Sequence, residues 1–137
     1  MYIFSNMNTM KRIILLLSIS ILFLATSCKS TKVVPEGLTA SQLLQRGQDF
    51  YGSENYETAE MYYLAVIEQY GNDLNTYIEA KYELAHLYSK TKDYKKAVAA
   101  YNEILDYYNM PESYQLKPAF KKLSEQGLSR IPQDKLN

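Results

Sequence analysis

Residues 55–70 read NYETAEMYYLAVIEQY, and residues 93–108 read DYKKAVAAYNEILDYY. The second segment repeats the first at an interval of 38 residues, counted from Tyr56 to Tyr94. The residues common to both segments are Tyr56/Tyr94, Ala59/Ala97, Tyr63/Tyr101 and Tyr70/Tyr108. Successive positions are three, four or seven residues apart, which is the spacing of one buried helix face. The internal repeat predicts two equivalent helices in an all-α protein.

A second helix is predicted ahead of each repeated one, over residues 43–51 and 77–88. The apolar positions of these two helices are Leu43, Gly47 and Phe50, then Leu84 and Tyr88. Short polar turns at 52–55 and 90–93 follow them, so each pair of helices is expected to form an antiparallel hairpin.

Helix starts are also marked in the sequence. Thr39 with Gln42 and Thr76 with Glu79 both fit the capping box, in which the two side chains satisfy free backbone amides of the first turn. We therefore expect the first helix of each hairpin to begin immediately after Thr39 and after Thr76.

Two hairpins alone would leave an apolar end uncovered, and helical repeat arrays use about three units or a terminal cap. A C-terminal helix over about 116–131 is predicted to be this cap, with Pro118 in its first turn and Pro132 ending it. Its apolar residues are Tyr114, Leu116, Phe120, Leu123, Leu128 and Ile131. The predicted domain spans 39–131, with repeats at about 40–71 and 78–109, and residues 132–137 form a tail.

The hairpins resemble the tetratricopeptide repeat (TPR). The matching residues are Gly47, Phe50, Tyr56, Ala59, Tyr63 and Val66 in the first unit and Leu84, Ala85, Tyr88, Tyr94, Ala97, Tyr101 and Ile104 in the second. The resemblance covers about 36–131 and implies a short right-handed α-solenoid that binds other proteins. The departures from the family pattern are Leu43, Arg46, Lys81, Gly71 and Asn109.

The interval of 38 residues is longer than the roughly 34 of the family, and the extra residues are expected in the connection 72–76. Long connections of this kind are similar to those of periplasmic TPR proteins such as the BamD-like assembly lipoproteins and the YbgF-like proteins. This likeness implies a role in the cell envelope, with outer-membrane assembly as one such role.

By the same resemblance, eight residues are expected to line a concave partner-binding groove. They are Leu44, Gln48, Tyr51, Glu79, Tyr82, His86, Ser89 and Lys90. Aromatic and polar groups together suit an extended or helical peptide segment, and the alternative is ordinary solvated surface. The Lys/Asn clamp with which chaperone-binding members hold acidic C-terminal tails has no counterpart here. His86 is the only histidine and has no second ligand close to it in sequence, so no metal site is predicted.

The first residues have the features of an export signal. Residues 10–12 read MKR, and residues 13–25 are apolar except for two serines, a run shorter than the roughly 18 residues that span a bilayer comfortably. Residues 24–28 read LATSC and resemble the lipobox of bacterial lipoproteins, which implies lipidation of Cys28. The alternative is an ordinary thiol at the end of an uncleaved anchor.

These features predict a signal peptide over 1–27, in which residues 1–9 precede a better start at Met10. Residues 28–38 would then form a lipidated tether, since Pro35 and Gly37 break any helix there. We expect a lipid-anchored protein of the cell envelope. By resemblance to sorted lipoproteins, the absence of Asp after Cys28 implies the periplasmic face of the outer membrane.

The composition excludes several functions. With 15 Lys and Arg against 15 Asp and Glu, the chain lacks the positive charge of a nucleic-acid binder. It has no nucleophile motif, Gly-rich phosphate loop or paired-carboxylate spacing, so we expect no enzyme activity and no cofactor.

The charges are divided unevenly along the chain. Residues 36–83 hold nine acidic and two basic side chains, and residues 84–137 hold six acidic and nine basic ones. Solvated helix faces explain this division, and so would the steering of different partners by the two halves or head-to-tail docking of a second copy. The sequence thus predicts a membrane-anchored adaptor with a protein or peptide partner. The alternatives are a lipoprotein that holds a small apolar or peptide ligand between its hairpins, and a structural homo-oligomer.

Overall fold

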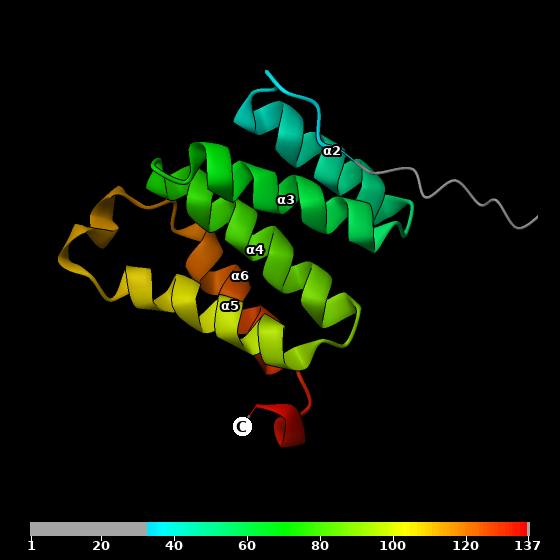
Figure 1. Ribbon diagram of the computed structural model, residues 1–137. Coiled ribbons are helices and arrows are strands. Elements are labelled where there is room, and N and C mark those ends of the chain that lie inside the picture. Colours follow the sequence, from blue (N-terminus) through cyan, green and yellow to red (C-terminus); the bar gives the residue numbers. More distant parts are fainter. Residues whose placement is uncertain (1–32, 137) are drawn as a thin grey trace, which may run out of the picture. The chain divides into compact units, whose positions relative to one another are not determined.

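The computed structural model describes residues 33–136, and this part of the chain contains five α-helices and no strand (Figure 1). The α-helices are α2 (Ala40–Gly52), α3 (Tyr56–Tyr70), α4 (Leu74–Lys90), α5 (Tyr94–Tyr108) and α6 (Ala119–Ser129). Two short 3-10 helices, η2 (Pro111–Gln115) and η3 (Gln133–Lys135), flank α6. The predicted all-α class is confirmed. Within the described residues, none of the helices combines the length and apolar character needed to cross a membrane.

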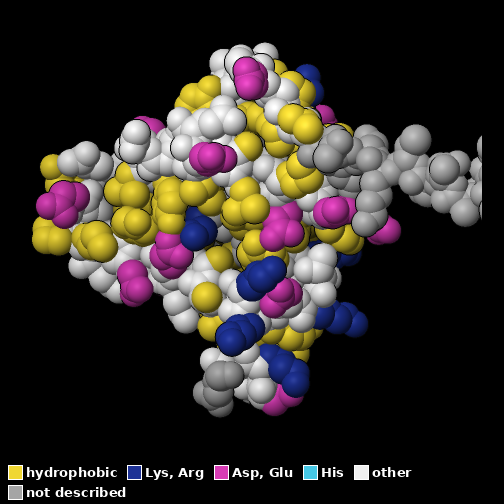
Figure 2. Space-filling view, viewed as in Figure 1, with side chains coloured by type: hydrophobic (Ala, Val, Ile, Leu, Met, Phe, Trp, Pro, Cys, Tyr) yellow, Lys and Arg dark blue, Asp and Glu magenta, His cyan; other side chains and the backbone are white. Residues whose placement is uncertain are grey.

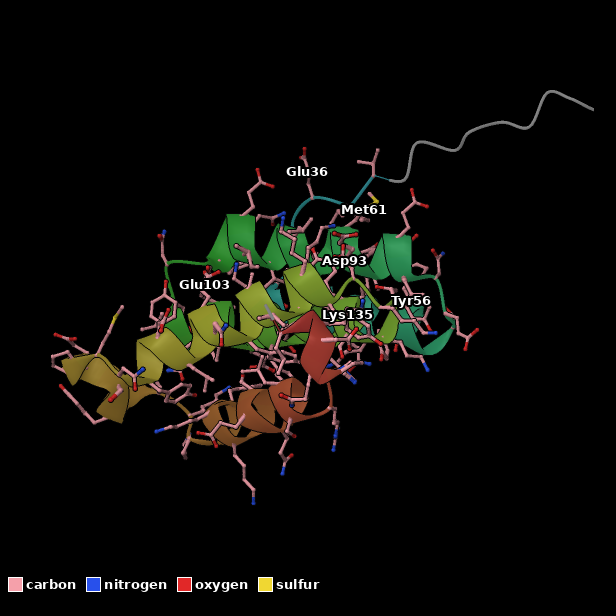
Figure 3. The ribbon with its side chains drawn as sticks, turned by 90° about the horizontal axis from the view of Figure 1, so that it is seen from below. Glu36, Tyr56, Met61, Asp93, Glu103 and Lys135 are labelled. Atoms are coloured by element: carbon pink, nitrogen blue, oxygen red, sulfur yellow. The ribbon has the colours of Figure 1, made fainter. Side chains whose placement is uncertain are left out.

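Consecutive helices pack against each other in antiparallel pairs. Helices α2 and α3 form the first hairpin, α4 and α5 form the second, and α3 against α4 joins them. Helix α4 is central, because it contacts every other α-helix. Helix α6 packs on α5 and α4; in Figure 1 it lies behind these two helices, and in Figure 3 it lies below α5. The C-terminal helix therefore covers the open end of the second hairpin.

One of the two predicted capping boxes is confirmed and the other is wrong. Thr39 accepts a hydrogen bond from the Gln42 amide, and the Gln42 side chain accepts one from the Thr39 amide at 2.9 Å. The second helix instead begins after Asp73, whose carboxylate accepts from the Thr76 amide at 2.8 Å. Asp is as effective an N-cap as Thr, and its position three residues earlier allows one more helical turn to form.

The extra residues of the repeat interval consequently lie in a helix. Helix α4 has 17 residues and α2 has 13, while only Gly71–Asp73 separates α3 from α4. The expectation of a long connection at 72–76 is wrong, and it was the basis of the likeness to the periplasmic TPR proteins.

Alanines and glycines allow the helices to approach closely around two buried tyrosines. Ala59 and Ala97 are both fully buried, as the repeat predicts. Tyr63 is fully buried beside Gly47, where an added Cβ would lie 2.7 Å from the tyrosine Cδ1. This contact requires glycine at position 47, because a methyl group there would overlap the ring.

The same strained turn ends α2 and α4. Glu54 has φ of 61° and Lys92 has φ of 64°, and these residues are equivalent in the repeat. Left-handed backbone at a residue with a Cβ costs about 1–2 kcal/mol. The recurrence of this conformation at both positions indicates that the hairpin geometry imposes it.

Two predicted peripheral segments differ in the structure. Val34 and Leu38, assigned to the tether, pack against the first core cluster, and the Tyr70 hydroxyl donates to the Leu38 carbonyl oxygen. These two residues therefore belong to the folded domain. Tyr114, assigned to the apolar face of the cap, lies in η2 and is 80% exposed. Leu116 and Ile131 are buried, as predicted.

Candidate functional site

The predicted groove residues lie on two neighbouring helices. Leu44, Gln48 and Tyr51 belong to α2, and Glu79, Tyr82, His86, Ser89 and Lys90 belong to α4. The two helices are joined by a hydrogen bond of 2.8 Å from the Gln48 side chain to the Glu83 carboxylate. Leu44 is only 8% exposed and is part of the first core cluster, so its side chain is largely withdrawn from the surface.

A row of rings crosses from α2 to α6. The His86 imidazole lies between Tyr51, with ring centroids 5.3 Å apart, and Tyr82, with centroids 6.1 Å apart. Tyr82 continues the row to Phe120 of α6, at 5.6 Å. The sequence placed Phe120 in the core of the cap and missed its contact with the groove. Its position in the first turn of the helix that packs on α4 is the signal that could have indicated this contact.

Tyr82 is half-buried: part of its ring packs against the core, and part is exposed at the surface. Its ring lies 6.2 Å from the buried Tyr101 and packs against both core clusters of the second hairpin. Tyr51 is also half-buried and has an edge contact with Tyr56 at 5.5 Å. Burial raises the pKa of both phenols above its usual value. Both hydroxyls therefore stay protonated at neutral pH and can donate hydrogen bonds.

The predicted groove divides into two hollows. One, of about 510 Å³, is lined by Leu44, Gln48 and Glu79 together with Lys117, whose ammonium pairs with Glu79 at 3.1 Å. The other, of about 270 Å³, lies between α4, α5 and α6. Its lining residues are Tyr82, His86, Ser89, Lys90, Tyr101, Leu123, Gln126, Gly127 and Arg130. Lys117, Gln126 and Arg130 were not predicted, because only the docking of the C-terminal helix brings them to α4.

A third hollow, of about 290 Å³, lies between the two hairpins. It is lined by Leu64, Ile67, Lys81, Leu84, Tyr88, Lys96, Ala99, Ala100 and Glu103. On the face of the molecule shown in Figure 2, hydrophobic side chains gather and charged groups lie between them. Glu103 of α5 (Figure 3) pairs with Lys81 at 2.9 Å and accepts a hydrogen bond from Tyr77. These polar contacts join the two helices of the second hairpin.

Residues 33–136 contain no group of three or more His, Cys, Asp or Glu side chains that could hold a metal ion. The ring neighbours of His86 are Tyr51 and Tyr82, neither of which is a carboxylate or thiol. Cys28, the predicted lipidation site, and the signal peptide lie outside the described residues.

Comparison with known proteins finds one informative similarity. No family model and no solved structure matches the chain. An uncharacterized protein of Treponema pallidum (strain Nichols) is 34% identical to it over 116 residues. The match covers 85% of this chain and 46% of the relative, so the chain spans about half the length of the protein that it matches.

Proposed function

We propose that this chain is a TPR-type adaptor, a short right-handed solenoid that binds a segment of a partner protein on the face formed by α2 and α4. The repeat and the paired helices support the TPR assignment, because both hairpins use the same buried positions, Ala59/Ala97 and Tyr63/Tyr101. The C-terminal helix caps the array.

The observation that carries the proposal is the row of Tyr51, His86 and Tyr82. These rings are half-buried and flank one another across two helices, so each still offers part of its surface to a ligand. Aromatic side chains held by neighbours lose little conformational freedom on binding and dominate many interfaces. Ser89 lines the same hollow as Tyr82 and His86 and provides a hydrogen-bonding group beside these rings.

The proposed location is the cell envelope, with a lipid on Cys28 as the anchor and the periplasmic face of the outer membrane as the site. This part of the proposal rests on the sequence of residues 10–28. A tethered adaptor gains from anchoring, because confinement at a surface raises its effective concentration toward a partner held there.

Capture of a partner from membranes tests the adaptor function. Tyr51→Ala removes a ring from the row. Because this ring is only half-buried, its removal should cost the domain little stability. Tyr114→Ala is the matched control, since this ring is 80% exposed in η2, away from the row. A stoichiometric partner retained by Tyr114→Ala and lost by a folded Tyr51→Ala supports the proposal. Equal capture by both variants would move the binding surface elsewhere.

A small-molecule carrier is the second candidate, favoured by the hollow between the hairpins. The apolar side chain of Leu64, which lines this hollow, is 47% exposed. The volume of about 290 Å³ lies just below the range of ligand sites, which is about 300–1,000 Å³. Native mass spectrometry of protein purified from membranes would detect such a ligand. It would also detect a homodimer, the third alternative.

A further inference from the structure

Two cationic side chains line the hollow between α4, α5 and α6. Lys90, at the end of α4, and Arg130, immediately after α6, both line it. None of its lining residues is acidic, and no ion pair within residues 33–136 involves either cation. By contrast, Lys81 and Lys117 each have a carboxylate partner.

Neutral hydrogen-bonding groups surround the same hollow. Ser89 and Gln126 contribute a hydroxyl and an amide, and His86 contributes an imidazole held between two tyrosine rings. The buried ring of Tyr101 forms one wall. Burial raises the pKa of Tyr101, as do Tyr82, Tyr51 and the Glu83 carboxylate, and the positive charge of Arg130 acts in the opposite direction. The guanidinium is thus close enough to influence a group on this wall.

Cations at helix C-termini also stabilise the helix dipole, and this effect alone would explain a Lys or Arg at each of these ends. It does not explain why both line one hollow, since the ends of α4 and α6 could have directed these long side chains outward. Two full charges also exceed the partial negative charge, about half a unit, at each helix end. The charged side chains that line the hollow therefore favour an anion.

We propose that this hollow binds a small ligand consisting of an anionic group, a phosphate or a carboxylate, on a compact apolar body. Lys90 and Arg130 pair with the anion, and Ser89 and Gln126 donate hydrogen bonds to it. The ring of Tyr82 and the side chain of Leu123 contact the apolar body. A volume of about 270 Å³ has room for a body of one ring, and larger ligands would extend into solvent. This inference does not depend on the adaptor function.

His86 provides a direct readout because it is the only histidine in the chain. The full chain, prepared in an uncharged detergent and without a histidine tag, is titrated with phenyl phosphate while the imidazole resonances are recorded by NMR. Phenol is the uncharged control probe. We expect saturable shifts with phenyl phosphate and none with phenol at the same concentrations. Benzoate in a parallel titration distinguishes a site that accepts both anions from one restricted to phosphate.

Two double variants with the same loss of charge complete the test. Lys90→Gln with Arg130→Gln should weaken phenyl phosphate binding by about tenfold or more, because charge-assisted hydrogen bonds are lost. Lys121→Gln with Lys122→Gln changes two exposed cations of α6 that do not line the hollow and should leave the affinity within about twofold. Equal weakening in both double variants, shifts caused equally by phenol, or no saturable shift with any anion would overturn the proposal.

Discussion

The ring of Tyr101 lies directly against the backbone of Gly127, so that an added Cβ at Gly127 would be 2.6 Å from the tyrosine hydroxyl oxygen. Tyr101 is 1% exposed and cannot rotate away. Through this contact α6 packs on the second hairpin. Tyr101 and Gly127 also line the hollow between α4, α5 and α6. The glycine weakens α6 as an isolated helix but allows the helix to dock.

The first prediction follows from this contact. Gly127→Ala should destabilise the domain by about 1–3 kcal/mol, because overpacking forces the ring or the helix to move. Gly52→Ala is the control, since an added Cβ there meets nothing within 4 Å. Gly52→Ala should be neutral or slightly stabilising, by up to about 1 kcal/mol. Chemical denaturation measures both free energies of unfolding, and equal effects would contradict the docking of α6.

The second prediction concerns the close approach of α4 and α5. Ala97 is fully buried, and Ala97→Leu should cost about 1–3 kcal/mol through overpacking. Ala99→Leu, two positions away on the exposed side of α5, makes the same chemical change outside the core and should cost less than about 0.5 kcal/mol. An unchanged melting temperature for Ala97→Leu would show that the helix register is wrong.

The third prediction concerns the N-cap of α4. Asp73→Ala should lower the melting temperature at neutral pH, because the Thr76 amide loses its acceptor. Asp73→Asn should stay close to the wild type, since asparagine caps equally well. A thermal scan of the two variants distinguishes a start at Asp73 from the discarded start at Thr76.

The same residue predicts a pH dependence. Hydrogen bonds from the Thr76 backbone and side chain lower the pKa of Asp73 below its ordinary value of 3.8. Its contribution to stability is therefore complete above pH 3.8 and is lost as the pH falls through the lowered value. Asp73→Asn has no such titration. The melting temperature of the wild type should fall relative to that of Asp73→Asn below about pH 3.8, and parallel curves would contradict the assignment.

The fourth prediction concerns the repeated turn. Lys92 has φ of 64°, and Lys92→Gly should stabilise the domain by up to about 1 kcal/mol because glycine adopts this conformation without a steric penalty. Lys95→Gly, within α5, should instead cost about 1 kcal/mol. Urea denaturation gives both values, and a loss of stability in both variants would show that the Lys92 side chain has a role of its own.

The fifth prediction concerns anchoring. Cys28→Ser removes the only thiol and should move the protein from the detergent phase to the aqueous phase of a membrane extraction. Met10→Ala, in the same expression host, tests whether translation begins at Met10. A chain that begins at Met10 would lack residues 1–9. A Cys28→Ser protein that stays in the detergent phase at full length would indicate a retained anchor in place of a lipid.

The helical period and the interval between Tyr56 and Tyr94 were sufficient to predict the helix class, the two hairpins and the buried positions Ala59 and Ala97. These features follow from local spacing, because residues three and four apart share a face in any α-helix. The start of α4 was predicted wrongly, since Asp73 and Thr76 are both competent N-caps and sequence alone does not rank them.

Tertiary structure decided the features that join segments distant in sequence. The docking of α6 buries Gly127 against Tyr101, brings Phe120 to Tyr82, and carries Arg130 to the hollow that Lys90 lines. No periodicity within one segment encodes these contacts, because they depend on the crossing of helices whose side chains interlock only after folding. The sequence alone therefore determined which faces are buried, and the packing of the helices determined which side chains meet on the surface that remains.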